Sequence, residues 1–145
     1  MTPEVRPIRI LLVEDSPGDV NLTREALHQA KVANELCVVG DGVEALQYLR
    51  GEGPFSHENP PDLVLLDLNL PRKDGREVLE EVKSDPQLKH IPVIVLTTSS
   101  DEADIMQSYR LHANAFVTKP VAFEQFITAL QQFEGFWLQV VRFAR

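Results

Sequence analysis

The chain has 145 residues, and its 22 acidic against 14 basic residues give a formal net charge of −8. This length buries enough surface for one domain that needs no disulfide or metal to fold, and the single Cys37 agrees with a reducing, cytoplasmic location. The scattered basic residues disfavour direct nucleic-acid binding, and the apolar run near the N-terminus is too short for a signal peptide or a membrane span.

Short apolar runs alternate along the chain with segments of helical pattern. The first run lacks the polar alternation of a strand with one wet face, which predicts a strand covered on both faces in a parallel sheet. We expect five strands, over residues 8–13, 35–39, 63–67, 91–97 and 115–118.

A helix is expected after each strand. The first begins with Ser16 as N-cap, Pro17 at the first helical position and Asp19 closing a capping-box-like pair with Ser16. Its buried stripe is predicted to contain Val20, Thr23, Leu27 and Ala30. The other helices are expected over residues 41–50, 75–84, 101–112 and from 121 onward.

Five strand–helix units with short connections predict an α/β fold: a doubly wound, five-stranded parallel sheet of order 2-1-3-4-5, as in flavodoxin-like proteins. We expect one domain over residues 1–145, with 133–145 as a C-terminal helical extension. The connection 51–61 is longer than usual for this fold. We interpret it as a surface insertion; the alternative is a partner contact centred on Phe55.

Polar residues end four of the strands, at the edge of the sheet where such folds bind ligands. They are Glu14 and Asp15, Asp67, Thr97, and Lys119. Three carboxylates at one edge repel one another unless a cation joins them. Oxygen ligands that leave room for water suit Mg²⁺, for which Mn²⁺ could substitute. Lys119 and Thr97 can contact phosphoryl oxygens, and Asp67 is placed to act as the nucleophile.

Each of these residues has an ordinary interpretation when taken alone. An acidic pair after a strand is often a helix N-terminal charge preference, a lysine before proline is usually solvated, and a threonine at a strand end is a common β-former. The joint pattern is the signal, because it needs acid–acid, acid, hydroxyl and lysine at the ends of strands one, three, four and five in that order.

The chain resembles the receiver domains of two-component response regulators from residue 8 to about 130. The matching motifs are LVEDSP at 12–17, LLDLNLP at 65–71 with Asp-Gly at 74–75, VIVLTT at 93–98 and AFVTKP at 115–120. The resemblance implies a phosphoacceptor signalling domain that catalyses only its own phosphorylation and dephosphorylation. Asp67 would accept a phosphoryl group from a sensor histidine kinase.

The resemblance also implies further site residues. Glu14, Asp15 and Asp67, with the backbone carbonyl of Asn69, would hold Mg²⁺ directly or through water. Glu14 stands where the family more often has aspartate. Thr97 and Phe116 would be the switch pair, the hydroxyl moving onto the phosphoryl group while the ring turns inward.

A finer resemblance links the chain to the single-domain regulators that serve cyanobacterial and bacterial phytochrome kinases. It rests on EDSPGDV at 14–20, LTREAL at 22–27, the long loop before Pro61, PRKDGREVL at 71–79 and LTTSSD at 96–101. The resemblance implies a phytochrome as the partner kinase and light as the upstream signal.

The sequence disfavours two other functions. A small phosphohydrolase with an aspartyl nucleophile needs a second acid two residues on, and Asn69 stands at that position, where it cannot protonate a leaving group. A flavodoxin-like flavin binder needs a hydroxyl-rich phosphate loop after strand one, whereas Glu14 and Asp15 repel phosphate unless a metal intervenes.

The end of the chain carries more apolar residues than one buried helix face uses. One stripe suits the sheet: Phe123, Ile127, Leu130, Trp137 and Val141. A second set lies largely outside it: Phe133, Phe136, Val140 and Phe143. We expect this second set to form a homodimer interface. The alternative is that Gly135 ends the helix and the tail folds back over the patch.

Overall fold

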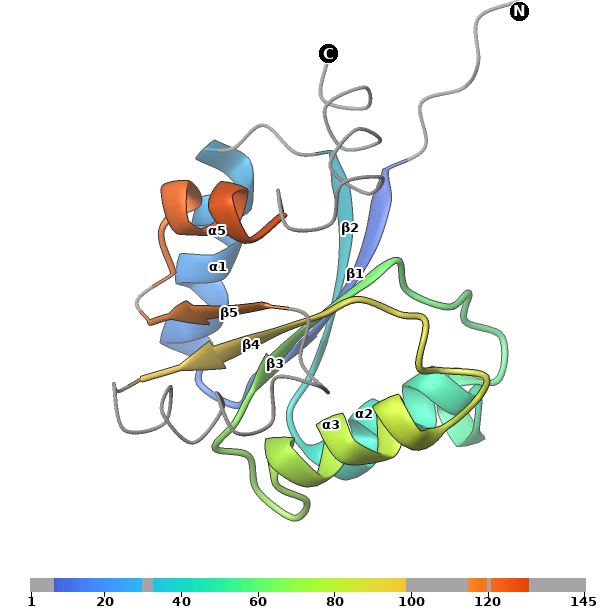
Figure 1. Ribbon diagram of the computed structural model, residues 1–145. Helices are drawn as coiled ribbons and strands as arrows, with labels where there is room; N and C mark the ends of the chain where they lie inside the picture. Colours follow the sequence, from blue (N-terminus) through green and yellow to red (C-terminus); the bar gives the residue numbers. More distant parts are fainter. Residues whose placement is uncertain (1–6, 30–32, 99–114, 120, 131–145) are drawn as a thin grey trace, which may run out of the picture.

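A computed structural model describes residues 7–29, 33–98, 115–119 and 121–130. In these ranges the chain forms one five-stranded parallel sheet of order β2-β1-β3-β4-β5, between two layers of helices (Figure 1). The predicted α/β class, strand order and parallel pairing are therefore confirmed. None of the helices in the described ranges combines the length and the apolar composition of a membrane-spanning segment.

The strands lie close to the predicted positions. Their bounds are β1 Ile8–Val13, β2 Asn34–Val39, β3 Leu63–Asp67, β4 Val93–Thr97 and β5 Ala115–Thr118. All residues of β3 and β4 are buried, as expected for central strands covered on both faces. β4 begins two residues later than predicted, because Ile91 is in a turn where its N–H donates to the Leu88 carbonyl.

The helices divide between the two faces of the sheet (Figure 1). They are α1 Pro17–Gln29, α2 Gly42–Arg50, α3 Gly75–Ser84 and α5 Phe123–Leu130. One core cluster joins alternate side chains of the sheet to α2 and α3, and a second joins the opposite side chains to α1. The contacts of α1 with α5 and of α2 with α3 complete the two layers.

The first helix differs from its predicted buried stripe at two positions. Thr23 and Leu27 are buried as expected, but Ala26 is buried too, while Val20 is only half-buried. The helix predicted over 101–112 lies outside the described residues, as do Ala30 and the extension 133–145.

The long connection after α2 is anchored to the core. Gly51 takes a positive φ of 65° at the helix end, where its N–H donates to the Tyr48 carbonyl. A short 3-10 helix, η1 Gly53–Phe55, follows. The Phe55 ring packs against Tyr48, with ring centroids 5.3 Å apart. The Phe55 ring is half-buried against this layer and so anchors the loop, while a partner contact centred on Phe55 stays a prediction.

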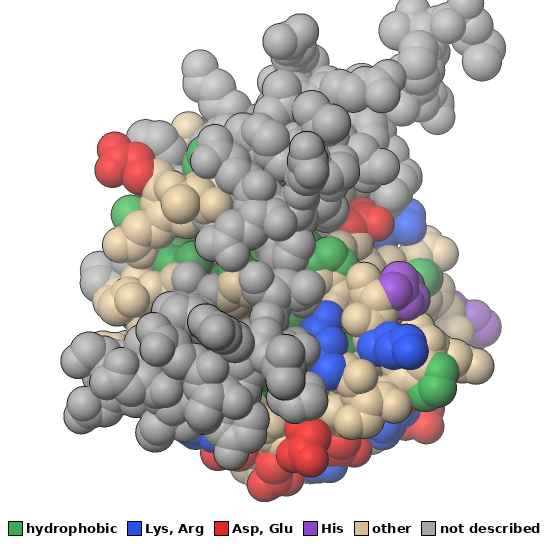
Figure 2. All heavy atoms as spheres, viewed as in Figure 1, with side chains coloured by type: hydrophobic (Ala, Val, Ile, Leu, Met, Phe, Trp, Pro, Cys, Tyr) green, Lys and Arg blue, Asp and Glu red, His purple; other side chains and the backbone are tan. Residues whose placement is uncertain are grey.

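Acidic and basic side chains lie side by side over the outer surface of α2 and α3, along the lower part of the view in Figure 2. Arg50 pairs with Glu81 and Asp85 at 3.6 and 3.9 Å, and Lys73 also contacts Glu81. These pairs are partly solvent-exposed, so each contributes little to stability. The helices are held mainly by the apolar core beneath them.

Candidate functional site

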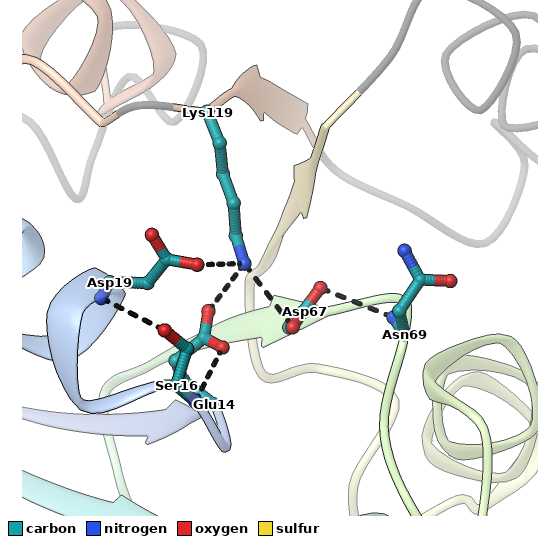
Figure 3. A network of polar contacts seen from close by, with 6 residues as sticks. All are labelled: Glu14, Ser16, Asp19, Asp67, Asn69 and Lys119. Carbon is teal, nitrogen blue, oxygen red and sulfur yellow. Dashed lines mark hydrogen bonds and ion pairs between the residues drawn. The ribbon is translucent and has the colours of Figure 1, made fainter.

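The polar residues that follow the strands meet at one edge of the sheet. Glu14 follows β1, Asp67 ends β3, Thr97 ends β4 and Lys119 follows β5. Figure 3 shows Glu14, Asp67 and Lys119 pointing toward one another from three different elements. The parallel topology thus brings residues more than 50 positions apart into direct contact.

Lys119 lies at the centre of this cluster. Its Nζ lies 2.6 Å from Glu14 Oε2, 3.0 Å from Asp19 Oδ2 and 3.2 Å from Asp67 Oδ2. The side chain is only 8% exposed. Burial alone would lower the pKa of Lys119, but the contacts with the three carboxylates outweigh it and raise the pKa above its usual value. The ammonium group is therefore charged across the physiological range.

Glu14 is a buried carboxylate held from two sides. It is 2% exposed, and its Oε1 accepts a hydrogen bond of 3.1 Å from the Ser16 N–H. Its Oε2 meets Lys119 in a close ion pair without the alignment of a hydrogen bond. Burial, with a smaller contribution from the charge of Asp67, raises the pKa of Glu14, and the Lys119 contact opposes that rise. A second cation would favour the ionised form further.

Asp67 is fixed by the loop that follows its strand. The carboxylate is 3% exposed, and its Oδ1 accepts a hydrogen bond of 3.1 Å from the Asn69 N–H. The Gly75 N–H in turn donates to the Leu68 carbonyl at 3.0 Å, which ties the start of α3 to the end of β3. Asp67 is thus oriented toward Lys119 before any ligand arrives.

Asp19 belongs to this cluster although the sequence pattern assigned it only to the helix start. Its N–H donates to Ser16 Oγ at 3.3 Å, as a capping box requires. The reciprocal bond is absent from the described contacts, because the Ser16 N–H bonds to Glu14 instead and the Asp19 carboxylate turns to Lys119. The predicted Ser16–Asp19 pair is therefore only half formed. The sequence feature that could have indicated this role is the position of Asp19 in the first turn of α1, next to the edge of the sheet.

Three carboxylates are arranged as a cation site. One oxygen each from Glu14, Asp15 and Asp67 lies within 4.8 Å of the others, and Asp15 is exposed while the other two are buried. An all-oxygen set that is open to solvent on one side suits a hard divalent ion that keeps some of its water. The residues present therefore fit such an ion. The Asn69 carbonyl remains a predicted ligand.

The predicted switch residues lie on neighbouring strands. Thr97 is fully buried, and its carbonyl accepts a hydrogen bond of 2.6 Å from the Lys119 N–H. Phe116 lies on β5, in register with Val95 of β4. The Phe116 side chain lies outside the described part of the structure, so the paired movement stays a prediction. The proposed interface residues are also outside it: Phe133, Phe136, Val140 and Phe143.

Comparisons with known proteins agree with this geometry. Residues 10–131 match the family model described as the response regulator receiver domain. The chain is 46% identical over 142 residues to the response regulator Rcp1 of Synechocystis sp., a match that covers 97% of each chain.

Solved structures give the same result. The bacteriophytochrome response regulator AtBRR is 49% identical, with 91% of this chain and 96% of that chain covered and a TM-score of 0.84. The phosphorylated cyanobacterial phytochrome response regulator RcpA is 51% identical, with 92% and 95% covered and a TM-score of 0.74. The Mn²⁺-bound form of Rcp1 is 47% identical, with 91% and 95% covered and a TM-score of 0.74.

Proposed function

The chain belongs to the response regulator receiver family, whose domains are phosphorylated on aspartate, and from this premise we propose that Asp67 is the phosphoacceptor. The observation that carries the proposal is the contact of Asp67 with Lys119 beside the carboxylate cluster. Asp67 is the member of that cluster at the end of the central strand β3, with its carboxylate already oriented.

The chemistry is a transfer between two nucleophiles. An Asp67 carboxylate oxygen forms a bond to phosphorus while the P–N bond of the donor phosphohistidine breaks, and the leaving imidazole takes up a proton. Negative charge on the phosphoryl oxygens must be neutralised during this step. Lys119 is placed to supply one positive charge, since its ammonium group is buried beside Asp67.

We propose Mg²⁺ as the ion at the carboxylate cluster, with Mn²⁺ as a substitute. Glu14, Asp15 and Asp67 would hold it, with the Asn69 carbonyl, directly or through water. When bound, the ion supplies further positive charge against the phosphoryl oxygens. The Mn²⁺-bound form of the relative Rcp1 supports a divalent ion here.

Hydrolysis of phosphate esters is not favoured. An aspartyl phosphohydrolase needs an acid to protonate the leaving group, and the residue two positions after Asp67 is Asn69. Asn69 contributes its N–H to Asp67 and exposes its neutral side chain. The domain therefore acts as a phosphoacceptor whose only reactions are its own phosphorylation and dephosphorylation.

The family relationship also indicates which kind of protein donates the phosphoryl group. The donor is a sensor histidine kinase, and the likeness to phytochrome response regulators supports a phytochrome, hence a light signal, in that role. Phosphorylation would draw the Thr97 hydroxyl onto the phosphoryl group and turn Phe116 inward, which reshapes the surface near β5. We also retain the homodimer through Phe133, Phe136, Val140 and Phe143 as a proposal.

Labelling with a small phosphodonor tests the assignment of Asp67. The protein is incubated with phosphoramidate, with and without Mg²⁺, and its intact mass is measured. We expect one Mg²⁺-dependent phosphoryl group that is stable to acid and labile to base, and that Asp67→Asn lacks. Labelling that survives this substitution without moving to a neighbouring carboxylate or hydroxyl would overturn the assignment.

A further inference from the structure

The carboxylate of Asp19 has no part in the function proposed above, yet it touches the Lys119 ammonium. Asp19 Oδ2 lies 3.0 Å from Nζ and approaches it from α1, beside Glu14 and opposite Asp67 (Figure 3). We propose that Asp19 is a positioning residue, which holds Lys119 and thereby limits its competition with the divalent ion for Glu14 and Asp67. The inference rests on the proposed function and deepens it at the same site.

The hydrogen bonds at the start of α1 leave the Asp19 carboxylate available to contact Lys119. In a complete capping box the Asp19 side chain would accept from the Ser16 N–H, but that N–H bonds to Glu14 Oε1 at 3.1 Å. The Asp19 main chain stays fixed through its own N–H, which donates to Ser16 Oγ. The side chain is 33% exposed, whereas Lys119 is 8% exposed. A fixed backbone therefore presents a charged group toward a buried cation.

Two cations are drawn to the same oxygens at this site. Glu14 and Asp67 each contact Lys119, and both also belong to the carboxylate cluster that fits a divalent ion. Like charges a few ångströms apart repel strongly when little water separates them. Asp19 contacts Lys119 but is not a member of the carboxylate cluster. It can therefore keep the ammonium paired when Glu14 and Asp67 turn to the metal.

Removal of this charge has a defined consequence. In Asp19→Asn the Lys119 ammonium retains only Glu14 and Asp67 as its carboxylate partners. Both of these residues also supply oxygens that the metal needs. The substitution keeps the size of the side chain and the main-chain bond to Ser16. We expect the dissociation constant of Mg²⁺, measured by isothermal titration calorimetry on the full chain, to rise about threefold to tenfold.

Two control variants separate position from charge. Glu25→Gln removes the same charge from an exposed position on α1, and it should change the Mg²⁺ dissociation constant by less than about twofold. Asp19→Glu keeps the charge and should restore most of the affinity. Thermal unfolding and circular dichroism of each variant should match the parent, which distinguishes a positioning role from a structural one.

A double-mutant cycle with Lys119→Met tests whether Asp19 affects Mg²⁺ binding through Lys119, because it can do so only if Lys119 is present. In the Lys119→Met background, Asp19→Asn should change the Mg²⁺ dissociation constant by less than about twofold. If Asp19→Asn weakens Mg²⁺ binding equally in both backgrounds, Asp19 acts only through its charge and the proposal is wrong. No effect in the parent background also overturns it.

Phosphorylation separates this inference from the proposed function. Asp19→Asn should react slowly with phosphoramidate at low Mg²⁺ and at nearly the parent rate when Mg²⁺ is saturating. If Asp19→Asn still reacts more slowly than the parent at saturating Mg²⁺, the positioning role of Asp19 is contradicted. The assignment of Asp67 as the acceptor is not affected by that result. If the parent protein is not labelled on Asp67, the proposed function fails, while the Mg²⁺ cycle still tests Asp19.

Discussion

Gly75 lies so close to Asp67 that a β-carbon at position 75 would lie 2.2 Å from the Asp67 carbonyl oxygen. It would also lie 2.7 Å from the Leu68 Cα. Both neighbours are backbone atoms, which cannot rotate away. The first turn of α3 is therefore packed directly against the end of β3, at the residue that carries the proposed acceptor carboxylate.

Gly75→Ala should consequently disturb both stability and phosphorylation. We expect a loss of about 1–3 kcal/mol in the free energy of unfolding, the usual cost of overpacking, and slower labelling of a displaced Asp67. Urea unfolding measures the free energy of unfolding, and phosphoramidate kinetics measure the rate of labelling.

Gly40→Ala is the matched control, since a β-carbon there meets nothing within 4 Å. This variant should leave the free energy of unfolding unchanged or raised by up to about 1 kcal/mol. Equal stability of the two variants would show that this contact relaxes without cost.

Thr97→Ala should separate metal binding from the conformational response. Thr97 is not in the carboxylate cluster, so Mg²⁺ binding should stay near normal. The proposed hydrogen bond from the Thr97 hydroxyl to the charged phosphoryl group contributes about 1.5–3 kcal/mol. Its loss should lower the equilibrium constant for the switched state by about tenfold or more. Calorimetry gives the affinity, and amide chemical shifts of β5 and α5 before and after phosphorylation give the response. Thr97→Ser retains the hydroxyl and is the control; equal loss of both properties in Thr97→Ala would indicate a structural role.

Asp41 should stabilise α2 in a pH-dependent manner. Burial alone would raise the pKa of Asp41, but the Glu44 N–H at 2.8 Å and the Arg72 guanidinium at 2.9 Å outweigh it and lower the pKa. The stabilisation is therefore present above the unfolded-state pKa of 3.8 and is lost as the pH falls through the lower, folded-state pKa.

Asp41→Ala tests this relationship. We expect the variant to lose about 0.5–2 kcal/mol of unfolding free energy at neutral pH, as for other helix N-caps. The difference from the parent should hold as the pH falls toward 5 and narrow below pH 4. Urea unfolding at several pH values measures it, and Asp41→Asn, which keeps a cap acceptor, should lose less. A difference that grows as the pH falls would contradict the assignment.

The proposed homodimer interface near the end of the chain is tested by measuring whether the protein is a monomer or a dimer. If Phe133, Phe136, Val140 and Phe143 form an interface, the unmodified protein should sediment as a dimer at micromolar concentration. The double variant Phe133→Glu, Phe136→Glu should then sediment as a folded monomer, because two charges cannot be buried at an apolar interface without large cost. If parent and variant are both folded monomers, the dimer proposal is wrong and the folded-back tail is preferred.

The sequence predicted the sheet well because its signals are local. The central strands β3 and β4 are dense apolar runs. Helix α3 follows the predicted bounds because Asp74 caps it by accepting from the Arg76 N–H. The meeting of Glu14, Asp67 and Lys119 was also predictable, since parallel strands bring their carboxyl ends to one edge. In these places local pattern and overall topology agree.

The residues that sequence reasoning misread depend on contacts between distant segments. Asp19 looked like half of a capping box, and only the position of Lys119, 100 residues later, shows where its carboxylate turns. The loop 51–61 was interpreted as a surface insertion, and only the placement of Tyr48 shows that the Phe55 ring anchors it to the core. A single sequence gives no measure of such long-range partners.

Reductive trapping of the phosphorylated protein tests the central claim most directly. Borohydride converts an aspartyl phosphate into homoserine, which peptide sequencing by mass spectrometry can locate. After reaction with phosphoramidate and Mg²⁺, we predict homoserine at position 67 alone, and none when Mg²⁺ is omitted. Reduction at Asp15 or Asp19 would place the homoserine at a different position, and reduction at Glu14 would give 2-amino-5-hydroxyvaleric acid instead. Trapping at any position other than Asp67 would contradict the account.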